Sequence, residues 1–180
     1  MSRLQEWLAD GLIITDGAWG TELQARGLPA GTIPDTWNLS NLERAEAVAR
    51  AYVEAGSQII LTNTFRANVV AMSDWLEDDL DAINRAGVGI SRQVAEHGLV
   101  FASLRPTGKM LLAEEIDSEQ VLAAFAAQSR SLAAAGADAL LVETMSDIEE
   151  ERLAVEAAKS TGLPVMFPSP STPARTTTAP

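Results

Sequence analysis

Three apolar runs of the sequence lead into polar residues whose side chains could bind a small charged group. The first run is followed by Asp16, the second by Asn63 and a later one by Glu143. In parallel α/β folds the chemistry lies at the carboxyl ends of the strands, so side chains in these positions meet at one rim. Two carboxylates and an amide gathered there suit a cationic group, such as the ammonium of an amino acid.

Each of these residues also has a purely structural interpretation. An acidic residue after a strand often caps the next helix, which applies to Asp16 and, to a lesser extent, to Glu143. Asn63 could satisfy a turn. Gly17 and Gly20 could expose backbone amides to an anion, although G-x-x-G spacing is common. Acid–base catalysis by the two carboxylates, in an unrelated barrel lyase or isomerase, is a further alternative.

The elements that must position these residues are short apolar runs that alternate with longer helical segments. The runs are nearly continuous in hydrophobicity, as expected for parallel strands covered on both faces, and they lie at 12–15, 59–62, 100–102, 139–142 and 163–167. Helical spacing predicts helices over 42–55, 81–96, 121–135 and 148–160. We expect N-terminal caps at Ser40, Asp117 and Ser146, and left-handed ends at Gly56, Gly136 and Gly162. This alternation predicts an α/β fold.

The composition excludes several classes of function. The 180 residues include one histidine, His97, and no cysteine, so the chain cannot supply the three or four thiolate or imidazole ligands that zinc prefers. The 25 acidic residues exceed the 13 basic ones, giving a net charge of −12, which argues against binding to nucleic acid or to a membrane surface. No run of about 18 apolar residues could span a membrane. The N-terminal residues match neither a signal nor a transit peptide, so we expect a cytoplasmic protein.

The composition changes near the end of the sequence. Residues 1–167 have the pattern of one α/β domain, whereas residues 168–180 are rich in Pro, Ser and Thr and contain no large apolar residue. Because proline removes an amide donor and restricts φ, we expect residues 168–180 to form an irregular tail.

Four segments carry a specific resemblance. They are Asp16–Leu23, Tyr52–Phe65, Pro106–Gly108 and Gly136–Asp147. In this order they closely resemble the homocysteine S-methyltransferase family, which includes the homocysteine-binding domain of cobalamin-dependent methionine synthase and the betaine-dependent enzyme. The resemblance covers about residues 10–167.

The resemblance implies a parallel (β/α) barrel of the TIM type with homocysteine bound at its C-terminal rim. It also implies a zinc ion that holds the homocysteine sulfur as a thiolate, which can then attack an activated methyl group. The positions that match the family's substrate site are Asp16 and Glu143 for the amino group, the backbone around Gly17 and Ala18 for the carboxylate, and Asn63 and Thr64 along the same rim. No residue is assigned a catalytic role.

The sequence departs from the family in three ways. The zinc-binding cysteines come from the second half of the family's barrel and are absent here. A complete barrel takes about 250 residues, so 180 residues correspond to about the first five βα units. Arg105 stands where the family usually has glycine, and this bulky cation could alter the pocket.

We therefore expect a truncated homocysteine S-methyltransferase that keeps the amino-acid-binding half of the site. The motifs do not identify a methyl donor. The alternative is a non-catalytic binding or regulatory half-barrel that is completed by a partner chain. The open edges of a partial sheet could also lead to self-association.

Overall fold

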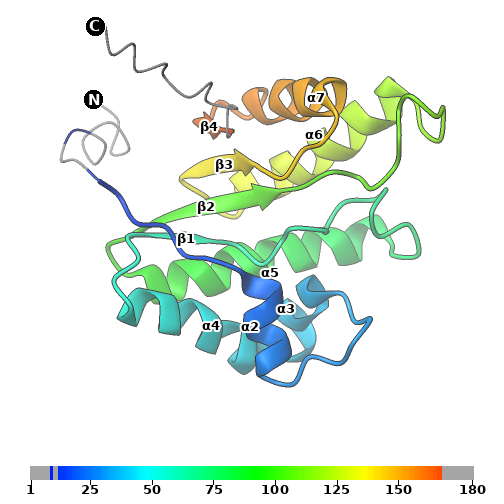
Figure 1. Cartoon of the computed structure of the whole chain (residues 1–180). Helices are drawn as coiled ribbons and strands as arrows, with labels where there is room; N and C mark the ends of the chain where they lie inside the picture. The colour runs from blue at the N-terminus through cyan, green and yellow to red at the C-terminus, as the bar shows by residue number, and fades with distance from the viewer. Residues whose placement is uncertain (1–8, 10–11, 168–180) are drawn as a thin grey trace, which may run out of the picture.

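The centre of the molecule is a parallel sheet (Figure 1). The computed structural model describes residue 9 and residues 12–167. Within these residues the strands are β1 (Ile59–Leu61), β2 (Leu99–Leu104), β3 (Ala139–Val142) and β4 (Val165–Met166). They pair in the order β1-β2-β3-β4, and every pair is parallel. Their carboxyl ends therefore lie at one rim of the sheet.

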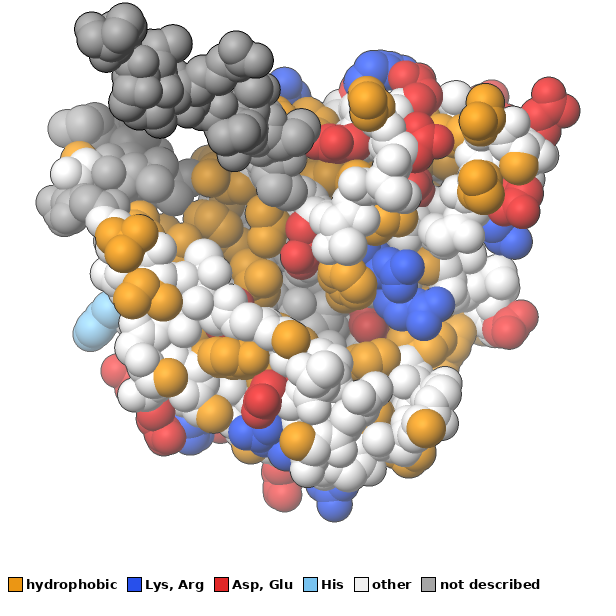
Figure 2. Space-filling model, in the orientation of Figure 1, with side chains coloured by type: hydrophobic (Ala, Val, Ile, Leu, Met, Phe, Trp, Pro, Cys, Tyr) orange, Lys and Arg blue, Asp and Glu red, His pale blue; other side chains and the backbone are white. Residues whose placement is uncertain are grey.

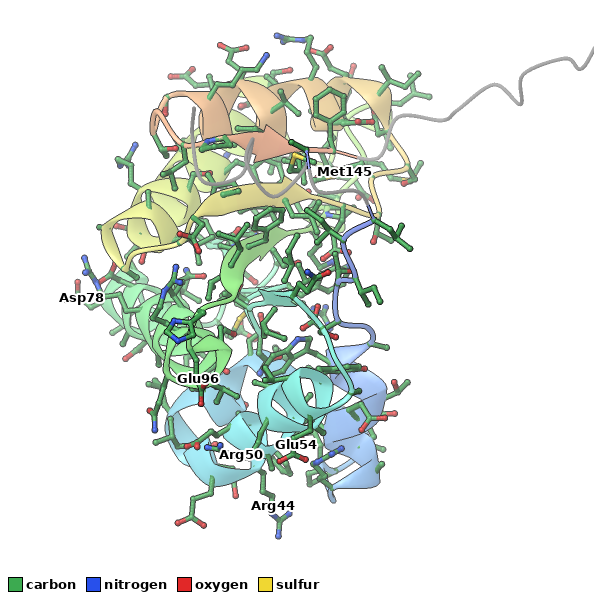
Figure 3. All side chains as sticks on the ribbon, turned by 90° about the vertical axis from the view of Figure 1, so that its left-hand side faces the viewer. Arg44, Arg50, Glu54, Asp78, Glu96 and Met145 are labelled. Atoms are coloured by element: carbon green, nitrogen blue, oxygen red, sulfur yellow. The ribbon has the colours of Figure 1, made fainter. Side chains whose placement is uncertain are left out.

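Long helices cover one side of the sheet. They are α4 (Leu42–Glu54), α5 (Glu77–Ala95), α6 (Ser118–Ala134) and α7 (Ile148–Lys159). α5 packs between α4 and α6, and α6 packs against α7. The shorter elements α2 (Trp19–Ala25), η1 (Pro34–Thr36) and α3 (Trp37–Ser40) precede α4. In the side view of Figure 3, α4 carries the exposed residues Arg44, Arg50 and Glu54 on its outer surface.

Side chains alternate along the strands, so apolar residues pack on both faces of the sheet. Ile60, Val100 and Leu140 belong to the main core, which packs against the helices. A second apolar cluster on the opposite face contains Ile59, Leu99, Phe101 and Ala139, with Leu61, Leu141 and Met166 packed against it. Figure 2 shows hydrophobic side chains lining a hollow in the face turned away from α5 and α6. This alternation agrees with the nearly continuous apolar runs of the sequence.

The predicted α/β class is confirmed, but the first predicted strand is not formed as such. Over residues 12–15 only Thr15 makes a bridge, to Ile59 of β1. The Ile14 carbonyl accepts both the Gln58 and the Ile59 amides, and the Leu61 amide donates to the side chain of Asp16. Because a side chain replaces the backbone partner, regular pairing cannot continue. The described sheet therefore has four strands in place of the expected five.

Two of the three predicted helix caps are wrong. Asn41 precedes α4, while the Ser40 hydroxyl donates to the Thr36 carbonyl within α3. Asp147 caps α7 in place of Ser146, because its carboxylate accepts the amides of the first turn. The capping box that begins at Asp117 is confirmed.

Other predicted features need smaller changes. The left-handed glycines Gly56, Gly136 and Gly162 are confirmed by positive φ angles. α5 begins at Glu77 rather than at residue 81, and β2 extends two residues beyond the predicted run, to Leu104. The predicted tail over residues 168–180 lies outside the described residues. In the part of the chain that the structure describes, no helix is long and apolar enough to cross a membrane.

Candidate functional site

Asp16 lies where the chain leaves the edge of the sheet. Its Oδ2 atom accepts a hydrogen bond from Trp19 Nε1 at 2.9 Å and another from the Leu61 amide at 3.0 Å. These two donors hold the carboxylate against the end of β1. The second oxygen, Oδ1, is buried and has no hydrogen-bond partner among the described residues. A buried carboxylate oxygen without a donor is costly, so the site is suited to a ligand that supplies one.

Glu143 follows β3 and lies close enough to Asp16 for the two charges to interact. Burial raises the pKa of Asp16 from 3.8 to about 6, and the charge of Glu143 acts in the same direction. Burial also raises the pKa of Glu143, while a hydrogen bond from Ser103 opposes this change. Two partly desolvated carboxylates therefore face each other at the rim. A cation placed between them would relieve both the desolvation and the repulsion.

The backbone around Glu143 has an unusual conformation that fixes its direction. The hydroxyl of Ser103, on β2, donates to Glu143 Oε1. Thr144, the next residue, has φ 61°, in the left-handed region that β-branched residues rarely adopt. Such strained conformations occur where the surrounding structure holds a functional group in place. The carboxylate is thus positioned by the adjacent strand on one side and by a strained turn on the other.

The backbone at Gly17 and Ala18 is exposed beside Asp16. Both residues are exposed, and their amides make no backbone hydrogen bond within the described part of the chain. A Cβ atom on Gly17 would lie 3.1 Å from the Tyr52 hydroxyl, so glycine allows the chain to pass beneath α4. The Tyr52 hydroxyl donates to the Ala18 carbonyl at 3.4 Å. These contacts keep two amides at the rim available to a ligand.

Asn63 and Thr64 are buried beneath the rim. The Asn63 side-chain amide donates to the Pro34 carbonyl at 2.9 Å and to Asn38 Oδ1 at 2.8 Å. The Thr64 hydroxyl contacts the Thr62 hydroxyl and donates to the Ser103 carbonyl at 3.1 Å. The side chains of both residues therefore connect the loop after β1 to neighbouring segments. The structure places Asp16 and Glu143 at the rim and these two residues in the layer below.

Sequence reasoning missed several residues that shape the rim. Trp19 is not among the predicted site residues, but its indole donates a hydrogen bond to Asp16 Oδ2. Ser103 lies beyond the predicted run, which ends at residue 102. Its spacing of two positions from Phe101 puts both side chains on the same face of the strand, and this spacing is the signal that could have identified it. Glu150 is buried, and its Oε1 accepts from the Thr107 amide and hydroxyl, both at 2.6 Å. This bond fixes the loop after β2.

Comparisons with known proteins place the chain in a family. The family described as homocysteine S-methyltransferase matches residues 13–178. This chain belongs to the homocysteine S-methyltransferase family. The match extends into residues 168–178, where the composition predicts an irregular tail. Membership removes the alternative that the chain is an unrelated barrel enzyme.

Similar proteins cover this chain well but are longer. The methionine synthase of Mycobacterium leprae is 30% identical over 168 residues, and that of Mycobacterium tuberculosis is 28% identical over 169 residues. In each case the match covers 84% of this chain and 14% of the relative. The metallated form of the homocysteine methyltransferase MmuM from Escherichia coli is similar with a TM-score of 0.77 and 25% identity, over 89% of this chain and 64% of that one. The chain therefore spans only part of its relatives.

The described residues do not fit a metal centre. Across residue 9 and residues 12–167, no group of three or more His, Cys, Asp or Glu side chains could hold a metal ion. Asp16 and Glu143 form only a pair, and the orphaned oxygen of Asp16 suits a hydrogen-bond donor. The described residues therefore offer no site that could hold zinc.

Proposed function

We propose that this chain binds homocysteine at the rim, with the ammonium group of the amino acid between Asp16 and Glu143. The observation that carries this proposal is the buried, unpartnered Oδ1 of Asp16 beside a second desolvated carboxylate. An ammonium has three donors and a positive charge. It therefore supplies the hydrogen-bond donor that Oδ1 lacks and the positive charge that stabilises two neighbouring carboxylates.

The neighbouring backbone supports binding of the rest of the amino acid. In this proposal the exposed amides of Gly17 and Ala18 receive the α-carboxylate, because they are adjacent to Asp16 and have no backbone acceptor. Asn63 and Thr64 act indirectly, since their side chains hold the loop after β1 in position. The substrate would then be oriented by its two charged groups.

We further propose that the sheet is a sector of a (β/α) barrel and that the chain carries the amino-acid-binding part of a homocysteine S-methyltransferase site. The sequential parallel strand order and the helices on one side support this reading. The role we assign to this chain is substrate binding, because the described residues do not fit zinc. Methyl transfer to the homocysteine thiol, giving methionine, is proposed for the complete site. The alternative of a binding half-barrel with a partner chain shares the same ammonium site.

Isothermal titration calorimetry with homocysteine and two analogues tests the proposal. One analogue, 4-sulfanylbutanoic acid, lacks the ammonium, and the other, 3-aminopropanethiol, lacks the carboxylate. We expect homocysteine to bind best and the analogue without the ammonium to lose binding. Equal affinity for homocysteine and 4-sulfanylbutanoic acid would contradict the ammonium site.

A methyl-transfer assay then distinguishes an active methyltransferase from a binding half-barrel. Methionine produced by the purified chain with zinc and a methyl donor would support an active transferase. Binding of homocysteine without methyl transfer would favour the binding half-barrel. Formation of methionine only after addition of a second, cysteine-containing chain would show that the site is completed by a partner.

A further inference from the structure

Two arginines at the same rim are not used by the homocysteine site. Arg66 lies in the loop after β1, and Arg105 directly follows β2. Because β1 and β2 are neighbouring parallel strands, these loops lie side by side. The guanidinium of Arg105 stacks over the ring of Phe65, 5.0 Å from its centre. This contact holds Arg105 beside the segment that carries Arg66.

Neither guanidinium donates a hydrogen bond to a described residue. The Nε atoms of Arg66 and Arg105 are buried and donate no hydrogen bond. Neither arginine forms an ion pair with a described residue, whereas other arginines of the chain do: Arg26, Arg50, Arg85, Arg92 and Arg152. In a chain with 25 acidic residues, two neighbouring arginines that form no ion pair with a described residue are unusual. Unsatisfied guanidinium donors indicate an absent acceptor.

Two acidic residues lie near this arginine pair. Burial lowers the pKa of Arg105, and the nearby charge of Arg66 acts in the same direction, while Asp35 and Glu150 oppose both. Asp35 is buried, and its Oδ1 accepts the Arg66 amide at 2.6 Å. Glu150 holds Thr107, two residues after Arg105. Glu150 Oε1 and Asp35 Oδ1 thus accept hydrogen bonds from backbone groups, and Asp35 Oδ2 has no hydrogen-bond partner among the described residues. Neither acid accepts a hydrogen bond from the guanidinium groups of Arg66 and Arg105 in the described part of the chain.

We propose that Arg66 and Arg105 form an anion-binding subsite for the phosphate or carboxylate group of a small molecule bound at this rim. Arginine remains charged at neutral pH and presents donors in a planar fork that matches these oxyanions. Both side chains are partly exposed, so an anion can reach them from solvent. Figure 2 shows a group of basic side chains on the same face as the apolar hollow. The subsite uses none of the residues proposed to bind homocysteine.

Calorimetric titrations with inorganic phosphate and with acetate, at constant ionic strength, test the subsite and distinguish the two anions. We expect saturable binding of one of them. Arg66→Gln and Arg105→Gln should each weaken it about tenfold or more, because each removes a charged fork. Arg130→Gln is the control: it removes an exposed arginine of α6 that makes no ion pair with a described residue. It should leave the affinity unchanged.

Amide NMR shifts of the unmodified chain provide a second readout that needs no variant to fold. Phosphate or acetate should shift the amide signals of residues 65, 66, 105, 107 and 108, while those of α4 stay unaffected. The proposal would be overturned if neither anion showed saturable binding. It would also be overturned if both glutamine variants bound the anion as tightly as the unmodified chain. Asp16→Asn should retain anion binding, so failure of the homocysteine site and failure of this subsite can be told apart.

Discussion

Relative to the unmodified chain, an Asp16→Asn variant should become more stable as the pH rises. Burial raises the pKa of this carboxyl in the folded protein from 3.8 to about 6. The folded state therefore holds the proton more tightly, and the associated stability is fully present below about pH 4 and lost as the pH rises through about 6. The difference in pKa corresponds to about 3 kcal/mol. Asparagine carries no charge, so the variant avoids this loss.

The size of the effect can be worked out for a practical range of pH. The chain has many more acidic than basic residues, so its net charge and its solubility fall in acid, and we keep the measurement above about pH 5. Between pH 5 and pH 8 the difference in unfolding free energy, variant minus unmodified, should change by about 1.5 kcal/mol in favour of the variant. Any cost of burying the asparagine NH2 group is independent of pH and cancels from this change.

Urea denaturation followed by circular dichroism at several pH values measures this difference. Asp78→Asn is the matched control, because it removes one exposed carboxylate from the first turn of α5 and corrects for the change in net charge. A difference that stays flat to within about 0.3 kcal/mol from pH 5 to pH 8 would refute the reasoning. In that case Asp16 would not be a desolvated carboxylate, and the argument for the ammonium site would lose its electrostatic basis.

Three further predictions follow from particular contacts. Glu143→Gln should weaken homocysteine binding by about 1.5–3 kcal/mol, the range for a charged hydrogen bond, and an unchanged affinity in calorimetry would count against the site. Gly87→Ala should lower the unfolding free energy by about 1–3 kcal/mol, because the new Cβ would lie 2.5 Å from Thr64 Cγ2. Gly89→Ala in the same helix meets no atom within 4 Å and should stabilise it by about 0.5–1 kcal/mol, so denaturation curves shifted in the same direction for both variants would be inconsistent with this packing. Asp117→Ala removes the capping box of α6 and should cost about 0.5–2 kcal/mol by the same assay; no change would show that the cap is dispensable.

Asp35 lies beside the arginine pair of the anion subsite. Burial raises the pKa of Asp35 to about 6 even though Arg66 and Arg105 oppose the change. Its Oδ2 atom is buried without a partner among the described residues. The rim thus has two desolvated aspartates, one beside Glu143 and one beside the arginine pair. A ligand with both an ammonium and an anionic group matches this distribution of charge.

Much of the fold followed from local pattern. Apolar runs located four of the strands, and the helical spacing located α4, α5, α6 and α7 to within a few residues. Gly56, Gly136 and Gly162 mark helix ends because glycine accepts a positive φ at no steric cost. Asp16 and Glu143 could be selected as rim residues because parallel topology brings the carboxyl ends of strands together. These features depend on neighbouring residues and on a general rule of topology.

The remaining features depend on contacts between residues that are distant in sequence. Ser103 donates to Glu143 across 40 positions, and the Leu61 amide donates to Asp16 across 45. No local pattern predicts which polar side chain will face another once strands and helices pack. For the same reason the inward direction of Asn63, toward Pro34 and Asn38, could not be read from its position after a strand.

The sequence by itself determined the α/β class, the approximate bounds of the elements and the family to which the chain belongs, because hydrophobic period and short motifs are local properties. Only the tertiary structure decided the hydrogen-bonding state of the rim: a carboxylate oxygen of Asp16 without a donor, and the guanidinium groups of Arg66 and Arg105 without an acceptor. Whether a polar atom is satisfied depends on every segment packed around it. That property exists only in the folded chain.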